Sequence, residues 1–184
     1  MNNPEYILIN DKKIKINTDY RVALECQHIA LDDEINDYER TLAIIYKLFG
    51  KEALDDEDNY EEYIAKAVKF LKCNQEEGKE ETGEPTFDYE QDWGYVKASF
   101  MSDYQIDLDK TQMHWWTFFN LLNGLTDKCI LNRVRQIRSE SLSGKKGKEL
   151  NDWIKAKESV KLKHKKSQHE KELDEWWEKT LRGE

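Results

Sequence analysis

Among the residues that could do chemistry, His114 lies in the most apolar setting of the sequence. A histidine in such a place can serve as a general base. However, no nucleophile or phosphate-binding motif of the GxSxG, GxGxxG or GxxxxGK[ST] type occurs in the sequence. Because buried polar groups usually have hydrogen-bond partners, we interpret His114 as a buried or half-buried histidine bonded to a backbone group. We therefore expect no catalytic residue, and we expect that the protein is not an enzyme.

Two other groups of residues have the side chains of a metal site without the spacing of one. His164 and His169 are five residues apart among lysines, whereas two ligands on one helical face are typically four apart. The acidic run 55–59 lacks the glycine and the later glutamate of a calcium-binding loop. We read the histidines as part of a solvated face and the acidic run as a helix entry, so the sequence predicts neither a metal site nor a cofactor.

The charge of the sequence bears on its partners and on its location. The 184 residues carry a net charge of -9, with 36% charged residues and a mean hydropathy of -0.93, which argues against a membrane protein. The lysines of residues 155–166 are not interleaved with aromatic residues, so nucleic acid is not expected as a partner. Three widely spaced cysteines and the absence of a secretory signal favour a reducing, cytosolic compartment.

The elements that must position these residues begin with a hairpin and three helices. Short β-favouring runs predict strands at 6–9 and 14–16. A helix capped by Thr18 or Asp19 follows, and then a helix with residues 32–34 in its first turn, which ends at Gly50. In that second helix the apolar positions that we expect on the buried side are Ile35, Tyr38, Leu42, Ile45 and Phe49. The same spacing predicts a third helix over 60–71.

The second half of the sequence predicts a core helix and a charged tail. Residues 74–86 contain no apolar side chain and should form a flexible loop, within a stretch from 51 to 92 that carries a charge of -10. Periodicity resumes over 87–100, and the run 113–122, begun by Thr111 or Gln112, should be the centre of the core. A helix capped by Thr126 or Asp127 follows, and a nearly all-charged helix extends from Lys148 to the end.

These patterns together predict a mainly α fold. We expect a bundle of about six helices with a small N-terminal β-hairpin and a long projecting C-terminal helix. The predicted domains are residues 1–140, the hairpin and the bundle, and residues 141–184, a linker and the charged helix. In that helix, Trp176 and Trp177 with Leu173 and Leu181 form an apolar group that we interpret as a docking patch, for self-association or for a partner.

Several segments in a fixed order carry a resemblance to a known family. They are Thr18–Leu24 after the hairpin, Phe100–Leu108, Met113–Phe118, Leu121–Leu125 and Val134–Arg138. In this order they resemble the phage gp-fifteen family, found in the tail morphogenesis genes of siphoviruses and prophages of low-GC Gram-positive bacteria. The resemblance extends over residues 7–138, and the run FxxDYxIDL followed closely by MHWW is its most distinctive part. A glycine is common in the family where Gln105 stands in this sequence.

The resemblance implies a tail assembly chaperone or the downstream partner of one. Its expected partners are the tape measure protein and other tail proteins, and it would act in the host cytoplasm and be absent from the mature virion. No catalytic residues are attached to the family. A chaperone for a long helical client needs apolar grooves. The candidate partner-binding residues are therefore His114, Trp115, Trp116, Phe119, Trp153, Leu173, Trp176 and Trp177.

Two rival functions remain open at this stage. An acidic regulatory module could bind and inhibit a host nucleic-acid enzyme by mimicking phosphate, with residues 51–92 as its surface. An enzyme built around His114 and nearby aspartates is the second rival. Binding to a host protein that heparin reverses, with no effect on the tape measure protein, would favour the first rival. Wild-type function in a folded His114→Gln variant would dismiss the second.

Overall fold

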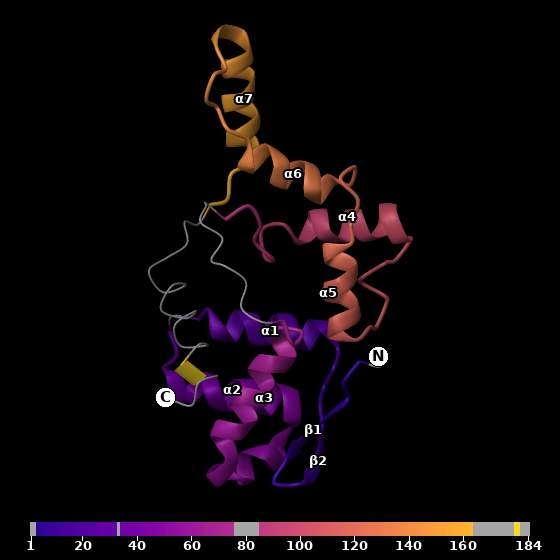
Figure 1. The fold of residues 1–184 in the computed structure, drawn as a ribbon, viewed down its shortest axis with the longest axis vertical. Helices are drawn as coiled ribbons and strands as arrows, with labels where there is room; N and C mark the ends of the chain where they lie inside the picture. The colour runs from indigo at the N-terminus through magenta and orange to yellow at the C-terminus, as the bar shows by residue number, and fades with distance from the viewer. Residues whose placement is uncertain (1–2, 33, 76–84, 164–178, 181–184) are drawn as a thin grey trace. The chain divides into compact units, whose positions relative to one another are not determined.

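The computed structural model describes residues 3–32, 34–75, 85–163 and 179–180, and it is mainly helical with one two-stranded hairpin (Figure 1). This confirms the predicted fold class. The chain divides into two compact units: unit 1 comprises residues 1–80, 112–120 and 167–184, and unit 2 comprises residues 81–111 and 121–166. The predicted division at residue 140 stays a prediction. In the described part of the chain, no helix is both long enough and apolar enough to span a membrane.

Unit 1 begins with the hairpin of β1 (Tyr6–Ile9) and β2 (Lys12–Lys15). The strands are antiparallel, and Ile7 pairs with Ile14. Asn10 and Asp11 form the turn with φ values of 45° and 64°, a left-handed conformation that these two residue types tolerate well. Because the turn takes two residues rather than four, β2 starts at Lys12, earlier than the predicted start at residue 14.

Helix α1 (Tyr20–Ala30) and helix α2 (Asp37–Phe49) follow the hairpin. Asp19 caps α1 by accepting a 2.9 Å bond from the Arg21 N–H, as one of the two predicted candidates. The predicted start of α2 at residues 32–34 is wrong. Asn36 and Glu39 form a reciprocal capping box, which fixes the first turn of the helix several residues later.

Helix α2 ends where the sequence predicts, but one of its residues is more exposed than expected. Gly50 ends α2 at a φ of 84°, as predicted, because this conformation is strained for a residue with a side chain. The buried side of α2 carries Ile44, Ile45 and Leu48. Tyr38, which was expected on the buried side, is 63% exposed.

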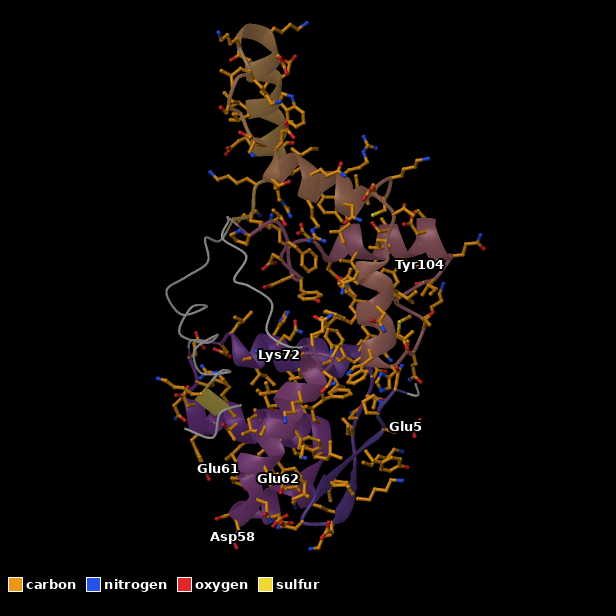
Figure 2. All side chains as sticks on the ribbon, in the orientation of Figure 1. Glu5, Asp58, Glu61, Glu62, Lys72 and Tyr104 are labelled. Carbon is orange, nitrogen blue, oxygen red and sulfur yellow. The ribbon has the colours of Figure 1, made fainter. Side chains whose placement is uncertain are left out.

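Two short 3-10 helices, η1 (Lys51–Asp55) and η2 (Glu57–Asn59), lead into α3 (Tyr60–Leu71), which has the predicted bounds. Acidic side chains cluster where α3 begins: Asp58, Glu61 and Glu62 lie there, and Lys72 lies at the other end of the helix (Figure 2). This distribution complements the helix dipole, which is positive at the N-terminus and negative at the C-terminus.

The core of unit 1 is aromatic and centres on the start of α5 (Trp115–Asn123). Trp115, Phe118 and Tyr20 are almost wholly buried. The Tyr20 and Phe118 rings stack with centroids 4.7 Å apart, and the Trp115 and Phe118 rings lie 5.8 Å apart. The prediction that residues 113–122 contain the centre of the core is therefore confirmed for unit 1.

Unit 2 contains α4 (Trp93–Tyr104), α6 (Ile130–Ser139) and α7 (Gly147–Val160). Its apolar core holds Val96, Phe100, Leu108, Leu131 and Val134. The predicted caps of α6, Thr126 and Asp127, were wrong, because the Cys129 sulfur accepts the N–H of Asn132 instead. Helix α7 begins near the predicted residue 148 and has no fully buried residue, but it ends at Val160, so the prediction of a continuous helix from residue 148 to the end of the chain is wrong. Residues 164–178 and 181–184 of the predicted tail lie outside the described residues.

Candidate functional site

His114 acts as the cap of α5. Its Nδ1 atom accepts a 3.0 Å hydrogen bond from the backbone N–H of Trp116. Because Nδ1 is an acceptor, the ring hydrogen is on Nε2, which donates to the carbonyl oxygen of Pro4 at 2.9 Å. Both ring nitrogens are therefore used by the backbone. This agrees with the interpretation of His114 as a satisfied structural histidine rather than a general base.

The two neighbouring tryptophans, Trp115 and Trp116, cap the end of a different helix. The last carbonyl groups of a helix have no partner within the helix. The Trp115 Nε1–H donates to the carbonyl oxygen of Leu71 at 3.0 Å, and the Trp116 Nε1–H donates to that of Phe70 at 2.9 Å. The Trp-Trp pair thus joins the start of α5 to the end of α3.

The predicted partner-binding residues differ in their exposure to solvent, and some of them lie outside the described residues. Trp115 has no exposed surface, so it cannot contact a partner in this conformation. Phe119 is half-buried with its ring 5.8 Å from that of Trp115, and Trp153 is half-buried under the ammonium of Lys145 at 4.9 Å. Leu173, Trp176 and Trp177 lie outside the described residues. Partner binding by this set stays a prediction.

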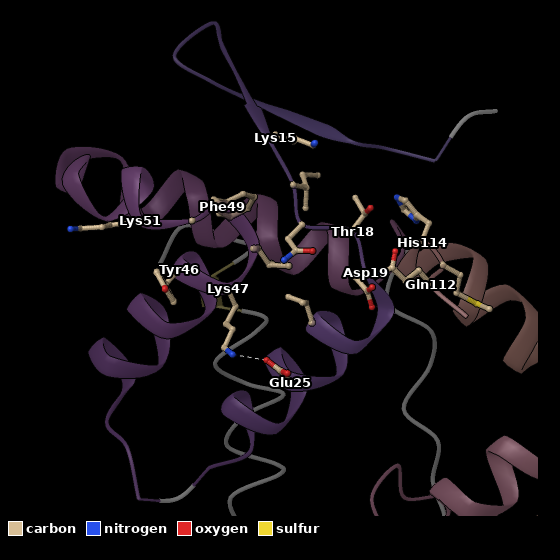
Figure 3. Close-up of a pocket in the computed structure, with 16 residues that line it drawn as sticks. Lys15, Thr18, Asp19, Glu25, Tyr46, Lys47, Phe49, Lys51, Gln112 and His114 are labelled. Atoms are coloured by element: carbon tan, nitrogen blue, oxygen red, sulfur yellow. Dashed lines mark hydrogen bonds and ion pairs between the residues drawn. The ribbon is translucent and has the colours of Figure 1, made fainter. Parts of the chain in front are cut away.

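A groove of about 1150 Å³ in unit 1 has His114 in its lining (Figure 3). It is formed by the end of β2, the first half of α1, the last turn of α2 and the segment before α5. The residues that line it are Lys15, Ile16, Asn17, Thr18, Asp19, Val22, Glu25, Tyr46, Lys47, Leu48, Phe49, Gly50, Lys51, Gln112, Met113 and His114. The sequence pattern indicated only His114 among them as a candidate, because residues from three separate stretches of the chain carry no common motif.

The charges in this groove are unequally compensated. Both of its carboxylates are paired: Asp19 binds Arg21 at 2.6 Å, and Glu25 binds Lys47 at 2.6 Å. The hydrogen bond from Arg21 lowers the pKa of Asp19, and the hydrogen bond to Glu25 raises the pKa of Lys47, so each bond favours the charged form of the group whose pKa it shifts. Lys15 and Lys51 are exposed and form no ion pair with the described residues. The groove therefore has an excess of positive charge.

The described residues offer little for catalysis or metal binding. Burial raises the pKa of the Cys26 thiol and of the Cys73 thiol to about 12, so neither is a thiolate nucleophile at neutral pH. Within the described part of the chain, no three His, Cys, Asp or Glu side chains are grouped so that they could hold a metal ion. In the acidic run, Asp56 accepts a hydrogen bond from Asn59 at 2.6 Å.

In unit 2 the main polar feature is a buried ion pair. Arg138 binds the fully buried carboxylate of Asp92 with two hydrogen bonds, of 2.6 and 2.8 Å. Arg138 also donates to the carbonyl oxygens of Thr86, at 2.9 Å, and Val160, at 2.6 Å. This one guanidinium therefore ties the segment before α4, helix α6 and the end of α7 together.

The segment that follows α7 is bound through its backbone groups by the side chain of Gln91. The side-chain amide of Gln91 donates to the carbonyl oxygen of Lys161 at 2.9 Å and accepts the N–H of Lys163, also at 2.9 Å. Because these bonds involve only the backbone of the held segment, they leave the charged ends of both lysines exposed. The sequence gives no signal for this contact, since the residues are about 70 positions apart.

The described residues form a mainly helical fold in which His114 caps a helix and a groove beside it is lined by lysines and apolar side chains. The model of the family described as Bacteriophage Gp15 protein matches residues 3–162. The chain belongs to this bacteriophage family, which is not a known family of enzymes and supports a role related to phage morphogenesis. Searches of curated proteins and of solved structures found no significant match.

Proposed function

We propose that the protein is a non-enzymatic tail assembly chaperone that binds the tape measure protein and assists assembly of the tail tube. The observation that carries the proposal is membership of the bacteriophage Gp15 family over residues 3–162. In this role the protein would act in the cytoplasm of the bacterial host and would be absent from the mature virion. Its partners would be the tape measure protein and other tail proteins.

The geometry supports a binding role in two ways. His114 has both ring nitrogens bonded to backbone groups, which removes the best candidate for a general base. The groove of unit 1 offers partly exposed apolar side chains, Val22, Phe49 and Met113, next to two lysines that form no ion pair with a described residue. A groove of this kind can hold one face of an amphipathic helix, which is how many helical clients are recognised.

The test is co-expression of the protein with the tape measure protein of the same phage. We expect the tape measure protein to become soluble and to co-purify with the chaperone, while it is insoluble when expressed alone. The proposal fails if the tape measure protein stays insoluble and no complex forms at low salt.

The acidic surface around the start of α3 supports one alternative, an inhibitor of a host nucleic-acid enzyme. Asp58, Glu61 and Glu62 lie together there and could mimic phosphate groups (Figure 2). A variant with all three residues changed to the amides should then lose binding to a host protein. The same variant should keep its complex with the tape measure protein if the chaperone proposal is right, so the two functions give opposite results.

A further inference from the structure

We propose that the groove of unit 1 is the docking site for an acidic amphipathic segment of the partner protein, which presents carboxylates to Lys15 and Lys51 and apolar side chains to the groove floor. This inference rests on the proposed function, because it takes the tape measure protein as the source of the segment. It goes beyond that function by naming the surface on the chaperone and the chemistry of the segment that binds there.

The first argument is the distribution of charge. The protein as a whole carries -9, yet the carboxylates in this groove, Asp19 and Glu25, are each neutralised by a cation at 2.6 Å. Lys15 comes from β2 and Lys51 from η1, and neither has an acidic partner among the described residues (Figure 3). Complementary charge steers association and selects partners, so a segment with acidic side chains is favoured over a basic one.

The second argument is the apolar character of the side chains at the floor of the groove. Val22, Phe49 and Met113 line the groove and are only partly buried, so apolar surface remains exposed to solvent. Tyr46 also lines it and is 52% exposed. A phosphate or another small anion would leave this apolar surface uncovered, whereas an amphipathic peptide segment would bury it and gain from the hydrophobic effect.

The third argument is the supply of unused hydrogen-bonding groups. The side chains of Asn17, Thr18 and Gln112 line the groove and make no hydrogen bond to any described residue. Specific docking surfaces combine apolar contact with a few polar groups that fix the orientation of the partner. The groove therefore has the three components of a peptide-binding site: an apolar floor, positive charge and free polar side chains.

The test compares two double variants that change the net charge equally. Lys15→Glu with Lys51→Glu reverses the two unpaired charges of the groove. Lys12→Glu with Lys128→Glu is the matched control, since both of these lysines are exposed, lie outside the groove and have no ion pair with the described residues. Circular dichroism before and after heating should show that both variants keep the helical content and cooperative melting of the wild type.

The probes are overlapping fluorescent peptides that cover the tape measure protein, with binding followed by fluorescence anisotropy. We expect at least one acidic amphipathic peptide to bind the wild type, and the groove reversal to weaken that binding by about tenfold because attraction becomes repulsion. The control should bind within about twofold of the wild type, because surface charges at a distance are screened by salt.

Three outcomes would overturn the inference. If both double variants bind the peptide equally well and still capture the full-length client, the groove is not the docking site, although the proposed function stands. If neither a peptide nor the full-length client binds the wild type, the proposed function fails and the inference fails with it. If the groove reversal instead abolishes self-association in sedimentation, or binding to an oligonucleotide, and leaves client capture unchanged, the occupant is a second copy or a nucleic acid.

Discussion

The two units of the chain are stabilised by different kinds of interaction. Unit 1 is built around stacked aromatic rings, with Trp115, Tyr20 and Phe118 buried. Unit 2 has its own apolar core but also a buried ion pair, Arg138 with Asp92, whose guanidinium binds two backbone carbonyl groups as well. Apolar burial is non-directional and tolerant, whereas a buried ion pair specifies one geometry and adds little net stability. We therefore expect unit 1 to be the stable scaffold and unit 2 the part that a single polar change can disrupt.

Removing one member of the ion pair should have the largest effect. Asp92→Ala leaves the Arg138 guanidinium buried without its counter-charge, which should reduce the free energy of unfolding by about 3–5 kcal/mol. Urea denaturation followed by circular dichroism measures this loss. The double variant Asp92→Leu with Arg138→Met removes both charges and should recover much of the stability. An equal loss in the single and the double variant would contradict the role assigned to the pair.

A smaller effect is expected in unit 1, where the two tryptophans provide a matched comparison. Trp115→Phe removes some buried volume and the one hydrogen bond that the carbonyl of Leu71 accepts from the described residues, and it should cost about 1–3 kcal/mol of unfolding free energy. Trp116→Phe should cost less, because the carbonyl of Phe70 also accepts the N–H of Cys73 at 3.0 Å and so keeps one bond. Thermal denaturation of both variants gives the order of stability, and the reverse order would be inconsistent with this account.

The smallest effect concerns pH and the carboxyl group of Asp103. The backbone N–H of Thr126 donates to Asp103 at 2.8 Å and lowers the pKa of that carboxyl below its ordinary value of 3.8. A lowered pKa in the folded state means that the carboxylate adds stability above its ordinary pKa and loses it as the pH falls through the folded value. Wild type should therefore melt at a higher temperature than Asp103→Asn at pH 7, and this difference should shrink as the pH falls below the ordinary pKa of 3.8. A difference that is constant with pH would show that the charge has no part in it.

Local patterns in the sequence predict much of the helical fold. The bounds of α3 follow from its apolar spacing, and Gly50 marks the end of α2, since both depend on neighbouring residues. The start of α2 was missed because a capping box at Asn36 outweighs the acidic residues before it. Tyr38 was placed inside because periodicity shows that a residue lies on an apolar face, but not whether another element covers that face.

The candidate site was much less predictable than the helices. The Trp115–Trp116 pair stands out in the sequence and suggests a docking surface, but its role depends on carbonyl groups of α3 that lie more than 40 positions away. The groove brings Lys15, Lys51 and Met113 together from distant segments. Such contacts are set by the packing of helices, which single-sequence patterns do not encode. By contrast, the interpretation of His114 as a satisfied histidine needed only the general behaviour of buried polar groups.

The most direct test of the account is hydrogen exchange of the purified protein alone and in its complex with the tape measure protein. The account predicts that binding slows exchange in residues 15–22, 46–51 and 112–114, the segments that form the groove of unit 1, and has little effect in α6. Protection of amides in unit 2 alone would contradict the account. So would a complex that forms without any change of exchange in these three segments.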